Sequence, residues 1–443
     1  MNLDIDIVPL SIFIVVGMFV LLLAGLPMAF VTGTMAVVIT LLLWGPNSLE
    51  IVLNRVTGFM KSYVFIAGPM FILMANVLQK SGVVEDLFRA VRVWFGPVGG
   101  GLAITSIIVG TIMAAMSGII GAAVVSLTLI ALPIMLRYGY SKQIACGAIM
   151  AGGGLGTLIP PSIVFVVYGL VTGASVGKLF MGGVFPGLML SAGYCTYVVV
   201  RCLINPKLGP PAPPEERQIT FLQKLALGKG LILPGLIIIM VLGSIYGGLA
   251  TPTEAGAVGS IGAFLSAMVH RKFNWTLVKE SLYPTLEATC MMAWLAFGSL
   301  SLVSVYELAG GANFIKQLML AMPVSPLGII IVMQLIIIVL GMIIDWLGIL
   351  FLTVPLFIPI VTSLGFDPVW FGVLFVMNIQ MAYLSPPFGQ GMFYVKGVAP
   401  SEVTMLDIVK SVWPFMGIQF VGLMIVIFNP QIALWLPNQM IGQ

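Results

Sequence analysis

Long apolar stretches recur along the chain, and they are interrupted at intervals by polar, proline or glycine positions. Runs of about 18 apolar residues can cross a bilayer as helices. The runs do not alternate with period two, which favours helices over a transmembrane barrel. The first half of the chain predicts helices at 9–25, 28–44 and 63–79, a hairpin at 98–137, a helix broken in its middle at 143–168, and a helix at 180–203.

The second half predicts the same series in the same order. Its helices are expected at 231–249, 253–269 and 284–307, followed by a hairpin at 324–362, a broken helix at 369–395 and a last helix at 412–435. The two series match because positions that break or turn a backbone recur 226 residues later. They include Pro160-Pro161 with Pro386-Pro387, Pro133 with Pro359, and Tyr168 with Tyr394. The chain therefore contains one pattern twice.

The number of crossings indicates how the two copies are related. Each half predicts five full crossings plus one hairpin that enters and leaves on the same side, so the second copy starts on the opposite side of the membrane. If the N-terminus lies outside, only four of the 19 lysines and arginines fall in outside loops, namely Arg55, Lys61, Lys178 and Lys316. Because cytoplasmic loops are enriched in Lys and Arg, this bias predicts that both termini are periplasmic. The fold class is an all-α polytopic membrane protein with two inverted-topology repeats.

A proline-rich polar segment divides the chain. Residues 205–229 form a predicted cytoplasmic linker between a first repeat at 1–204 and a second repeat at 230–443. Two shorter amphipathic stretches, 49–61 and 84–94, predict helices that lie in the plane of the membrane as braces, with docking of a partner as the alternative.

Composition agrees with a membrane protein, since 60% of residues are hydrophobic, 8% are charged and the mean hydropathy is +1.15. The cysteines stand singly in apolar surroundings and predict small buried hydrophobic side chains. The single histidine, His270, precedes Arg271-Lys272 at a helix end and predicts a loop near the lipid headgroups. A membrane-embedded enzyme is disfavoured because no His, Cys or paired-Asp constellation is present. No cofactor is expected.

The strongest candidate site is the first helix break, Gly152–Ser162. Four glycines and two prolines cannot continue a helix, and unwound backbone at membrane depth is tolerated where it is buried in protein or lines a cavity. Its carbonyls and the Thr157 hydroxyl can coordinate a sodium ion, while helix N-termini face an anion. The ion-site candidates are Gly153, Gly156, Thr157 and Pro160, and the substrate-site candidates are Gly154 and Ser162. The alternative is a packing kink.

The second break, 378–391, has a different chemistry. Ser385 and Pro386 are candidates for an ion site, and Asn378, Gln380 and Gln390 are candidates for substrate contacts. Lys396 closes this broken helix. It is either a further contact for an anionic substrate or a lysine that extends to the cytoplasmic interface, the latter being favoured.

The tips of the two hairpins are the remaining candidates, Ser117-Gly118 in the first copy and Gly341 to Asp345 in the second. Each tip is expected to meet the break of its own half near the middle of the bilayer, which gives two ion sites. Asp345 is a carboxylate within the membrane and is costly there unless it is paired. We expect it in or beside the second sodium site, with a cap of the following helix as the alternative. Glu254, in contrast, is assigned a structural role at a helix start, with Thr251 or Thr253 as the N-cap.

These motifs resemble the large membrane subunit of tripartite ATP-independent periplasmic (TRAP) transporters, and the resemblance runs from the first helix to the last. It rests on the segments 154–162, 168–173, 249–257, 341–345 and 378–387. The family often has a Ser-Gly-Ser-Ser tip where this chain has Ser117-Gly118-Ile119-Ile120. With two hydroxyls gone, the first ion site is expected to rely on backbone carbonyls.

The resemblance implies an elevator mechanism, in which scaffold helices stay fixed while hairpins and broken helices carry substrate and sodium. It implies scaffold helices within 1–96 and 230–322 and transport elements within 97–204 and 323–443. It also implies two separate partner proteins, a membrane subunit of about four helices and a periplasmic substrate-binding protein that delivers an organic anion.

The resulting hypothesis is sodium-coupled uptake of a small organic acid across a bacterial inner membrane. The alternative is a stand-alone ion-coupled anion transporter of related inverted-repeat fold that needs no binding protein. A channel is disfavoured because two hairpins that approach from opposite sides suit alternating access better than a continuous pore.

Overall fold

The computed structural model describes residues 6–118, 120–213, 223–224, 227–387 and 389–439, and the regular elements within these ranges are all helical. Within the predicted linker 205–229, residues 214–222 and 225–226 lie outside these ranges. Its described start, residues 206–212, is hydrogen-bonded to the base of the first hairpin. Gly100 N donates to Gly209 O at 2.8 Å and Ala212 N donates to Gly96 O at 2.9 Å.

The first half contains the predicted segments. Its elements are α1 (Ile7–Leu23), α2 (Met28–Trp44), α3 (Glu50–Met60), η2 (Tyr63–Ile66), α4 (Ala67–Lys80), α5 (Val83–Phe95), α6 (Gly101–Ser117), α7 (Ile120–Arg137), α8 (Lys142–Gly154), η3 (Leu155–Thr157), α9 (Ile163–Thr172) and α10 (Val176–Ile204). The pair α6 and α7 is the first hairpin. The first broken helix is α8, η3 and α9. The elements α3 and α5 are helices at the two predicted amphipathic stretches.

The second half repeats this order. Its elements are α13 (Ile232–Tyr246), α14 (Pro252–Val269), α15 (Trp275–Leu308), α16 (Gly311–Leu320), α17 (Pro326–Gly341), α18 (Trp346–Ser363), α19 (Pro368–Leu384), α20 (Gln390–Val398), α21 (Met405–Phe428) and α22 (Gln431–Leu434). The second hairpin is α17 and α18, and the second broken helix is α19 and α20. The Pro160-Pro161 and Pro386-Pro387 peptide bonds at the two breaks are both cis.

The starts of two helices, α15 and α21, differ clearly from the predicted ones. α15 begins at Trp275 rather than near residue 284, because it is the continuous counterpart of α3, η2 and α4 together. The first half is interrupted at Lys61-Ser62, whereas the equivalent pair in α15 is Glu287-Ala288, which favours a helix. The last helix starts at Met405 because Thr404 caps it. α16 was not predicted and is the second-half equivalent of α5.

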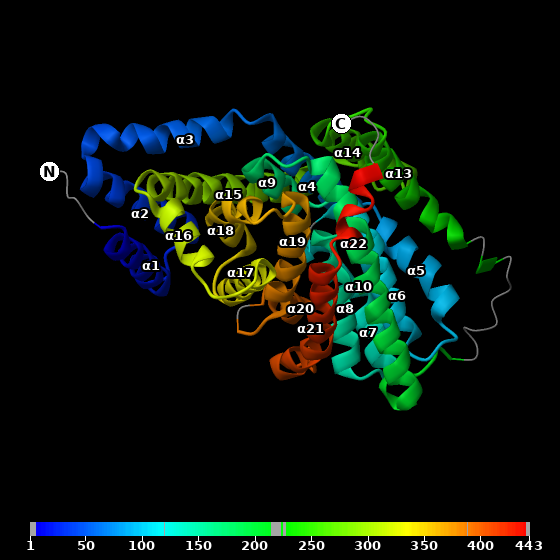
Figure 1. Ribbon diagram of the computed structural model, residues 1–443. Helices are drawn as coiled ribbons and strands as arrows, with labels where there is room; N and C mark the ends of the chain where they lie inside the picture. Colours follow the sequence, from blue (N-terminus) through cyan, green and yellow to red (C-terminus); the bar gives the residue numbers. More distant parts are fainter. Residues whose placement is uncertain (1–5, 119, 214–222, 225–226, 388, 440–443) are drawn as a thin grey trace.

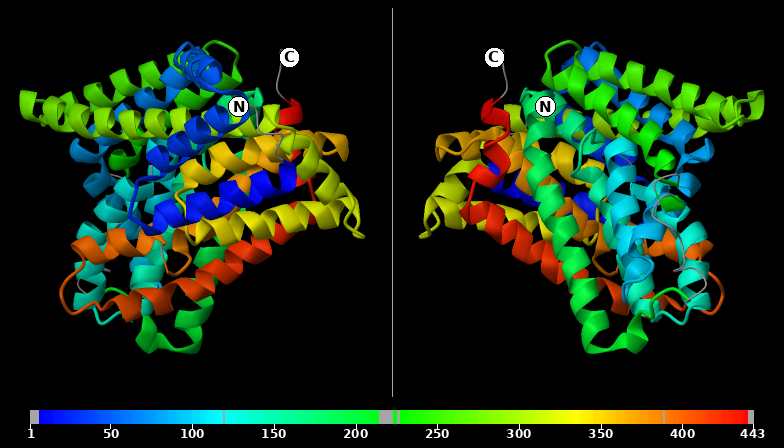
Figure 2. Two further views of the ribbon diagram at one scale, coloured as in Figure 1. Left: turned by 90° about the vertical axis from the view of Figure 1, so that its left-hand side faces the viewer. Right: turned by 90° about the vertical axis from the view of Figure 1, so that its right-hand side faces the viewer.

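Long helices frame the molecule. Figure 1 shows α3 across the top of the view above α15, with which it is in contact. In both views of Figure 2, α10 runs steeply down through the molecule while α15 lies along its upper side. Among the described residues, seven helical segments are long and apolar enough to cross a membrane. The chain is therefore a multi-pass membrane protein.

The glycines of the first hairpin and first broken helix let these elements touch closely. A Cβ added to Gly110 in α6 would lie 2.5 Å from the carbonyl carbon of Gly152 in α8. A Cβ added to Gly153 would lie 2.5 Å from Val124 Cγ2 in α7. The first break is thus held tightly between the two arms of its hairpin.

Two single-residue predictions concern the outer helices. His270 lies at the C-terminal end of α14 as expected, with Nε2 at 3.1 Å from Asp86 Oδ2. The prediction of buried cysteines is correct for Cys146 and Cys202, whereas Cys195 is half-buried and the prediction is wrong for Cys290, which is exposed on α15. The physical reason is that lipid chains are as apolar as a protein core, so an apolar sequence context does not distinguish the two environments.

Candidate functional site

Each hairpin tip rests on the break of its own half. Gly118 ends α6 with φ +60°, and a Cβ on it would lie 2.5 Å from Pro161 O. Gly341 ends α17, and a Cβ on it would lie 2.2 Å from the Cβ of Ala382, near the end of α19. The structure therefore brings together the four segments in which the sequence analysis placed its candidates.

The polar groups of the first break are satisfied within the turn. Thr157 Oγ1 donates to Gly154 O at 3.2 Å, and Ser162 Oγ donates to Thr157 O. Ser162 also caps α9, accepting a hydrogen bond from Phe165 N at 3.4 Å. All three residues are buried. Of Ser117, the structure describes only its position as the last residue of α6.

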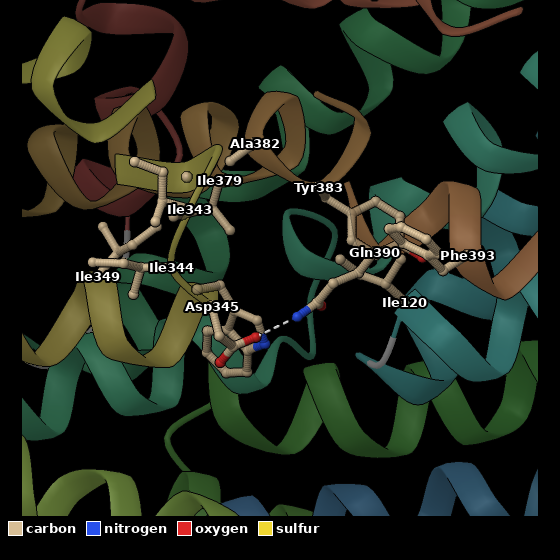
Figure 3. A pocket seen from close by; sticks show the side chains of 12 residues that line it. Ile120, Ile343, Ile344, Asp345, Ile349, Ile379, Ala382, Tyr383, Gln390 and Phe393 are labelled. Carbon is tan, nitrogen blue, oxygen red and sulfur yellow. Dashed lines mark hydrogen bonds between the residues drawn. The ribbon is translucent and has the colours of Figure 1, made fainter. Parts of the chain in front are cut away.

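Asp345 joins the second tip to the second broken helix. It is the N-cap of α18, where Oδ2 accepts from Leu347 N at 3.1 Å, and Oδ1 accepts from Gln390 Nε2 at 2.6 Å. Figure 3 shows this hydrogen bond across the cavity. One carboxylate oxygen of Asp345 therefore caps α18, as the alternative prediction had it, while the other is hydrogen-bonded to Gln390, the first residue of α20.

The other polar residues of the second break are placed differently. Ser385 Oγ donates to Met381 O at 2.7 Å. Asn378 Nδ2 donates to both the carbonyl and the side-chain oxygen of Gln334 in α17, each at 2.7 Å. Gln380 is fully buried, and neither polar atom of its side chain has a partner among the described residues.

Two neighbouring cavities lie at these tips and breaks. The larger, of about 300 Å³, is lined by Ile120, Gly341, Ile343, Ile344, Asp345, Trp346, Ile349, Ile379, Ala382, Tyr383, Gln390 and Phe393. The smaller, of about 160 Å³, is lined by Ile72, Gly118, Ile120, Gly121, Thr157, Ile163, Val164, Ala288, Met291, Met292, Trp346, Leu347, Tyr383, Gln390 and Tyr394. The two cavities share four wall residues, namely Ile120, Trp346, Tyr383 and Gln390.

Several helices begin at the walls of these cavities. α7 begins at Ile120, α9 at Ile163, α18 at Trp346 and α20 at Gln390, and each of these residues is a wall residue. The N-terminus of a helix carries a partial positive charge and unpaired N–H groups, so this arrangement suits an anionic ligand.

The sequence candidates divide into two groups. Gly118, Thr157, Gly341, Asp345 and Gln390 line the cavities. The walls do not include Asn378, Gln380, Ser385 or Lys396. Lys396 is exposed, and its Nζ donates to Val403 O at 2.9 Å, so the favoured alternative fits its position better than a substrate contact.

The remaining candidates, Gly153, Gly154, Gly156, Ser162, Pro160 and Pro386, belong to the two breaks beside the cavities. Their roles as ligands stay predictions. The aromatic walls formed by Trp346, Tyr383, Phe393 and Tyr394 were not predicted from the sequence. The available signal was the recurrence of Tyr168 as Tyr394, beside the second break.

Comparisons with known proteins agree with this architecture. A family model described as the DctM component of the tripartite ATP-independent periplasmic transporter matches residues 15–432. The chain is 32% identical to the C4-dicarboxylate TRAP transporter large permease protein DctM of Vibrio cholerae, covering 98% of both chains. It is 27% identical to the sialic acid permease SiaM of the same species (95% of this chain, 97% of the relative) and to the ectoine permease TeaC of Halomonas elongata (94% and 96%).

Solved structures share the fold at low sequence identity. The Alcanivorax borkumensis YdaH transporter superposes with a TM-score of 0.64 at 14% identity, over 94% of this chain and 98% of that one. Neisseria gonorrhoeae MtrF gives a TM-score of 0.60 at 13% identity, over 88% and 83%. Because both the family model and a relative above 30% identity span nearly the whole chain, the protein belongs to the DctM family, the large permease component of TRAP transporters.

Proposed function

We propose that this chain is the large permease subunit of a TRAP transporter that takes up a small organic anion across the bacterial inner membrane, driven by sodium. The observation that carries the proposal is the meeting of both hairpin tips and both helix breaks at two neighbouring cavities. Broken helices that point their N-termini into a central cavity are the common substrate sites of inverted-repeat transporters.

Sodium is the proposed coupling ion because the breaks supply its preferred ligands, oxygen atoms, without a cluster of titratable groups. The first proposed site uses the backbone around Gly153, Gly156, Pro160 and the tip Ser117-Gly118, together with the Thr157 hydroxyl. The second uses Asp345 with the backbone around Gly341, Ser385 and Pro386. Asp345 is suited to this role because one of its oxygens faces the cavity, where Gln390 is its hydrogen-bond donor.

An elevator movement is the proposed transport step. In it α6–α10 and α17–α21 move as transport elements against scaffold helices that include α4 and α15. The smaller cavity supports this division, because Ile72 of α4 and Ala288, Met291 and Met292 of α15 face the tips and breaks across it. A ligand held there would lie at the boundary between a fixed and a moving part.

Two partners complete the proposal, a small membrane subunit of about four helices and a periplasmic binding protein that delivers the anion. Family membership supports both. The proposed orientation has both termini in the periplasm, which the excess of Lys and Arg in the predicted cytoplasmic loops supports.

The proposal is tested by uptake into proteoliposomes that contain this chain and its small subunit, with the binding protein added outside. We expect uptake to require an inward sodium gradient. Ser117→Ala, Thr157→Ala and Asp345→Ala should each raise the sodium concentration needed for half-maximal uptake. Thr196→Ala is the matched control, because the hydroxyl of this exposed residue donates only within its own helix, to Ala192 O at 2.8 Å.

Two results would contradict the proposal. Equal uptake in potassium buffer without a sodium gradient would show that sodium is not the coupling ion. Unaltered sodium dependence in all three variants would show that these residues do not form the sodium sites.

A further inference from the structure

The walls of the two cavities carry almost no charge. Among the described residues that line them, Asp345 is the single charged side chain, and neither Lys, Arg nor His is present. Most of the other side chains are aliphatic or aromatic. A ligand in these cavities therefore meets a carboxylate but no side-chain cation.

The smaller cavity is the more favourable place for one anionic group. The N-terminal residues of α7 and α9, Ile120 and Ile163, form part of its wall together with Thr157. Independently, Tyr383 is 6% exposed, lines both cavities, and has a hydroxyl without a partner among the described residues. An unpaired buried O–H is a donor available to a carboxylate oxygen.

The larger cavity is suited to an apolar group. Ile343, Ile344, Ile349 and Ile379 form one side, and Phe393 lies opposite, as Figure 3 shows. The Asp345–Gln390 pair lies between them. A second carboxylate placed here would leave water without a side-chain cation to pair with, and the sodium ion proposed at this tip is already paired with the Asp345 carboxylate.

The charges of the proposed transport cycle also favour a substrate with a single negative charge. Two sodium ions, one per hairpin tip, together with the Asp345 carboxylate give a net charge of +1. A single substrate carboxylate neutralises this charge, whereas a dianion leaves the buried site negative, which is costly in a low-dielectric interior.

We propose that this permease selects organic acids with one negative charge and an apolar body, and discriminates against dicarboxylates. The acid group lies in the smaller cavity, and the body extends over Gln390 into the larger one. The inference rests on the proposed function, since it assumes that the two neighbouring cavities together form the substrate site.

The test is ligand binding to the purified full chain in lipid nanodiscs. Trp346 lines both cavities, so quenching of its fluorescence reports binding, and Trp346→Phe identifies the signal. The probes are 4-methylpentanoate and pentanoate against glutarate and succinate, each titrated in sodium chloride and in choline chloride, with thermal stabilisation as a second readout. We expect the dissociation constants of the monocarboxylates to be at least tenfold lower, and to rise when choline replaces sodium.

The two buffers separate the inference from the proposed function. Sodium-dependent binding of the dicarboxylates that equals or exceeds that of the monocarboxylates overturns the inference and leaves the function intact. Preference for the monocarboxylates that is identical in sodium and choline keeps the inference and contradicts sodium coupling. Binding of neither class, with both readouts unchanged, contradicts both.

A gain of function sharpens the test. Phe393 is 52% exposed at the larger cavity, so Phe393→Arg adds a cation opposite the isoleucines. We expect this variant to lower the dissociation constant of glutarate at least tenfold relative to Phe393→Leu, the control for loss of the ring. An unchanged preference in Phe393→Arg would show that charge at the larger cavity does not set selectivity.

Discussion

At the scale of single residues, the tips work by close backbone contact. Gly341 and Gly118 have no side chain where the tip rests on a break, and any larger residue would occupy space that another atom already fills. Asp345 and Gln390 then add one charge-assisted hydrogen bond between hairpin and broken helix. The site is therefore assembled by steric fit at the glycines and by one polar pair.

Replacing Gly341 with alanine tests the steric part. The added Cβ would lie 2.2 Å from Ala382 Cβ, so we expect a loss of about 1–3 kcal/mol of stability or a displaced tip with reduced uptake. Thermal unfolding in detergent and the proteoliposome assay measure the two effects. Gly417→Ala in α21 is the control, since nothing lies within 4 Å of its added Cβ. Equal behaviour of both variants would mean that the tip is not tightly packed.

Residue types alone could locate the breaks but not the partners of each side chain. The density of glycine and proline at 152–162 and 378–391 identified both breaks, because these residues constrain the backbone locally, and glycine or polar residues midway along each hairpin identified both tips. Asn378 and Gln380 were expected at the substrate, yet Asn378 is bonded to Gln334 and neither residue lines a cavity. Which way a side chain on α19 points depends on the rotation of that helix within the bundle, which local sequence does not determine.

At the scale of elements, side-chain caps fix the starts of two helices in the second half, α14 and α21. Thr251 caps α14 and Thr404 caps α21, each in a reciprocal capping box with Glu254 or Asp407 three residues later. The structural role at a helix start that the sequence predicted for Glu254 is confirmed by this capping box. The capping box at Thr404 also explains why α21 starts at Met405 and not near residue 412. The predicted start was too late because it was placed from hydropathy and not from the cap.

Breaking either box should lower stability without affecting ligand binding. We expect Thr251→Ala and Thr404→Ala each to cost about 1 kcal/mol, and Thr251→Ala with Glu254→Gln to cost less than the sum, because the two bonds form one reciprocal unit. Thermal unfolding in nanodiscs is the measurement. Thr57→Ala is the control, since its exposed hydroxyl donates only to Leu53 O within α3. A loss as large in Thr57→Ala would argue against the caps as the cause.

At the scale of the whole molecule, the repeated order of elements follows from a repeated sequence. Hydropathy and the spacing of breaks were sufficient to predict the helices and the hairpins, and the number of crossings predicts the inverted relation of the two halves. The long reach of α15 and the presence of α16 were not predicted, because amphipathic and lipid-facing segments give a weaker hydropathy signal than a continuous span.

The proposed sidedness can be measured directly. In a background with the native cysteines replaced by serine, we expect Lys61→Cys to react in intact cells with a maleimide that cannot cross the membrane. Lys207→Cys should react only after the inner membrane is permeabilised. Both positions are exposed, so accessibility to the reagent is not limited by burial. The opposite labelling pattern would reverse the assigned orientation.

The two repeats differ in one mechanical respect. α15 is an unbroken helix of 34 residues, about 50 Å long, whereas its first-half equivalent is jointed at Lys61-Ser62 between α3 and η2. Helical geometry continues through α15, although Pro284 removes one of its backbone hydrogen bonds, whereas Ser62 in the first arm is extended (φ −74°, ψ 118°), so a load applied equally to both arms deflects the first more than the second. The inward and outward strokes of the proposed cycle therefore work against unequal stiffness, and the two end states are not required to be mirror images even though the repeats are.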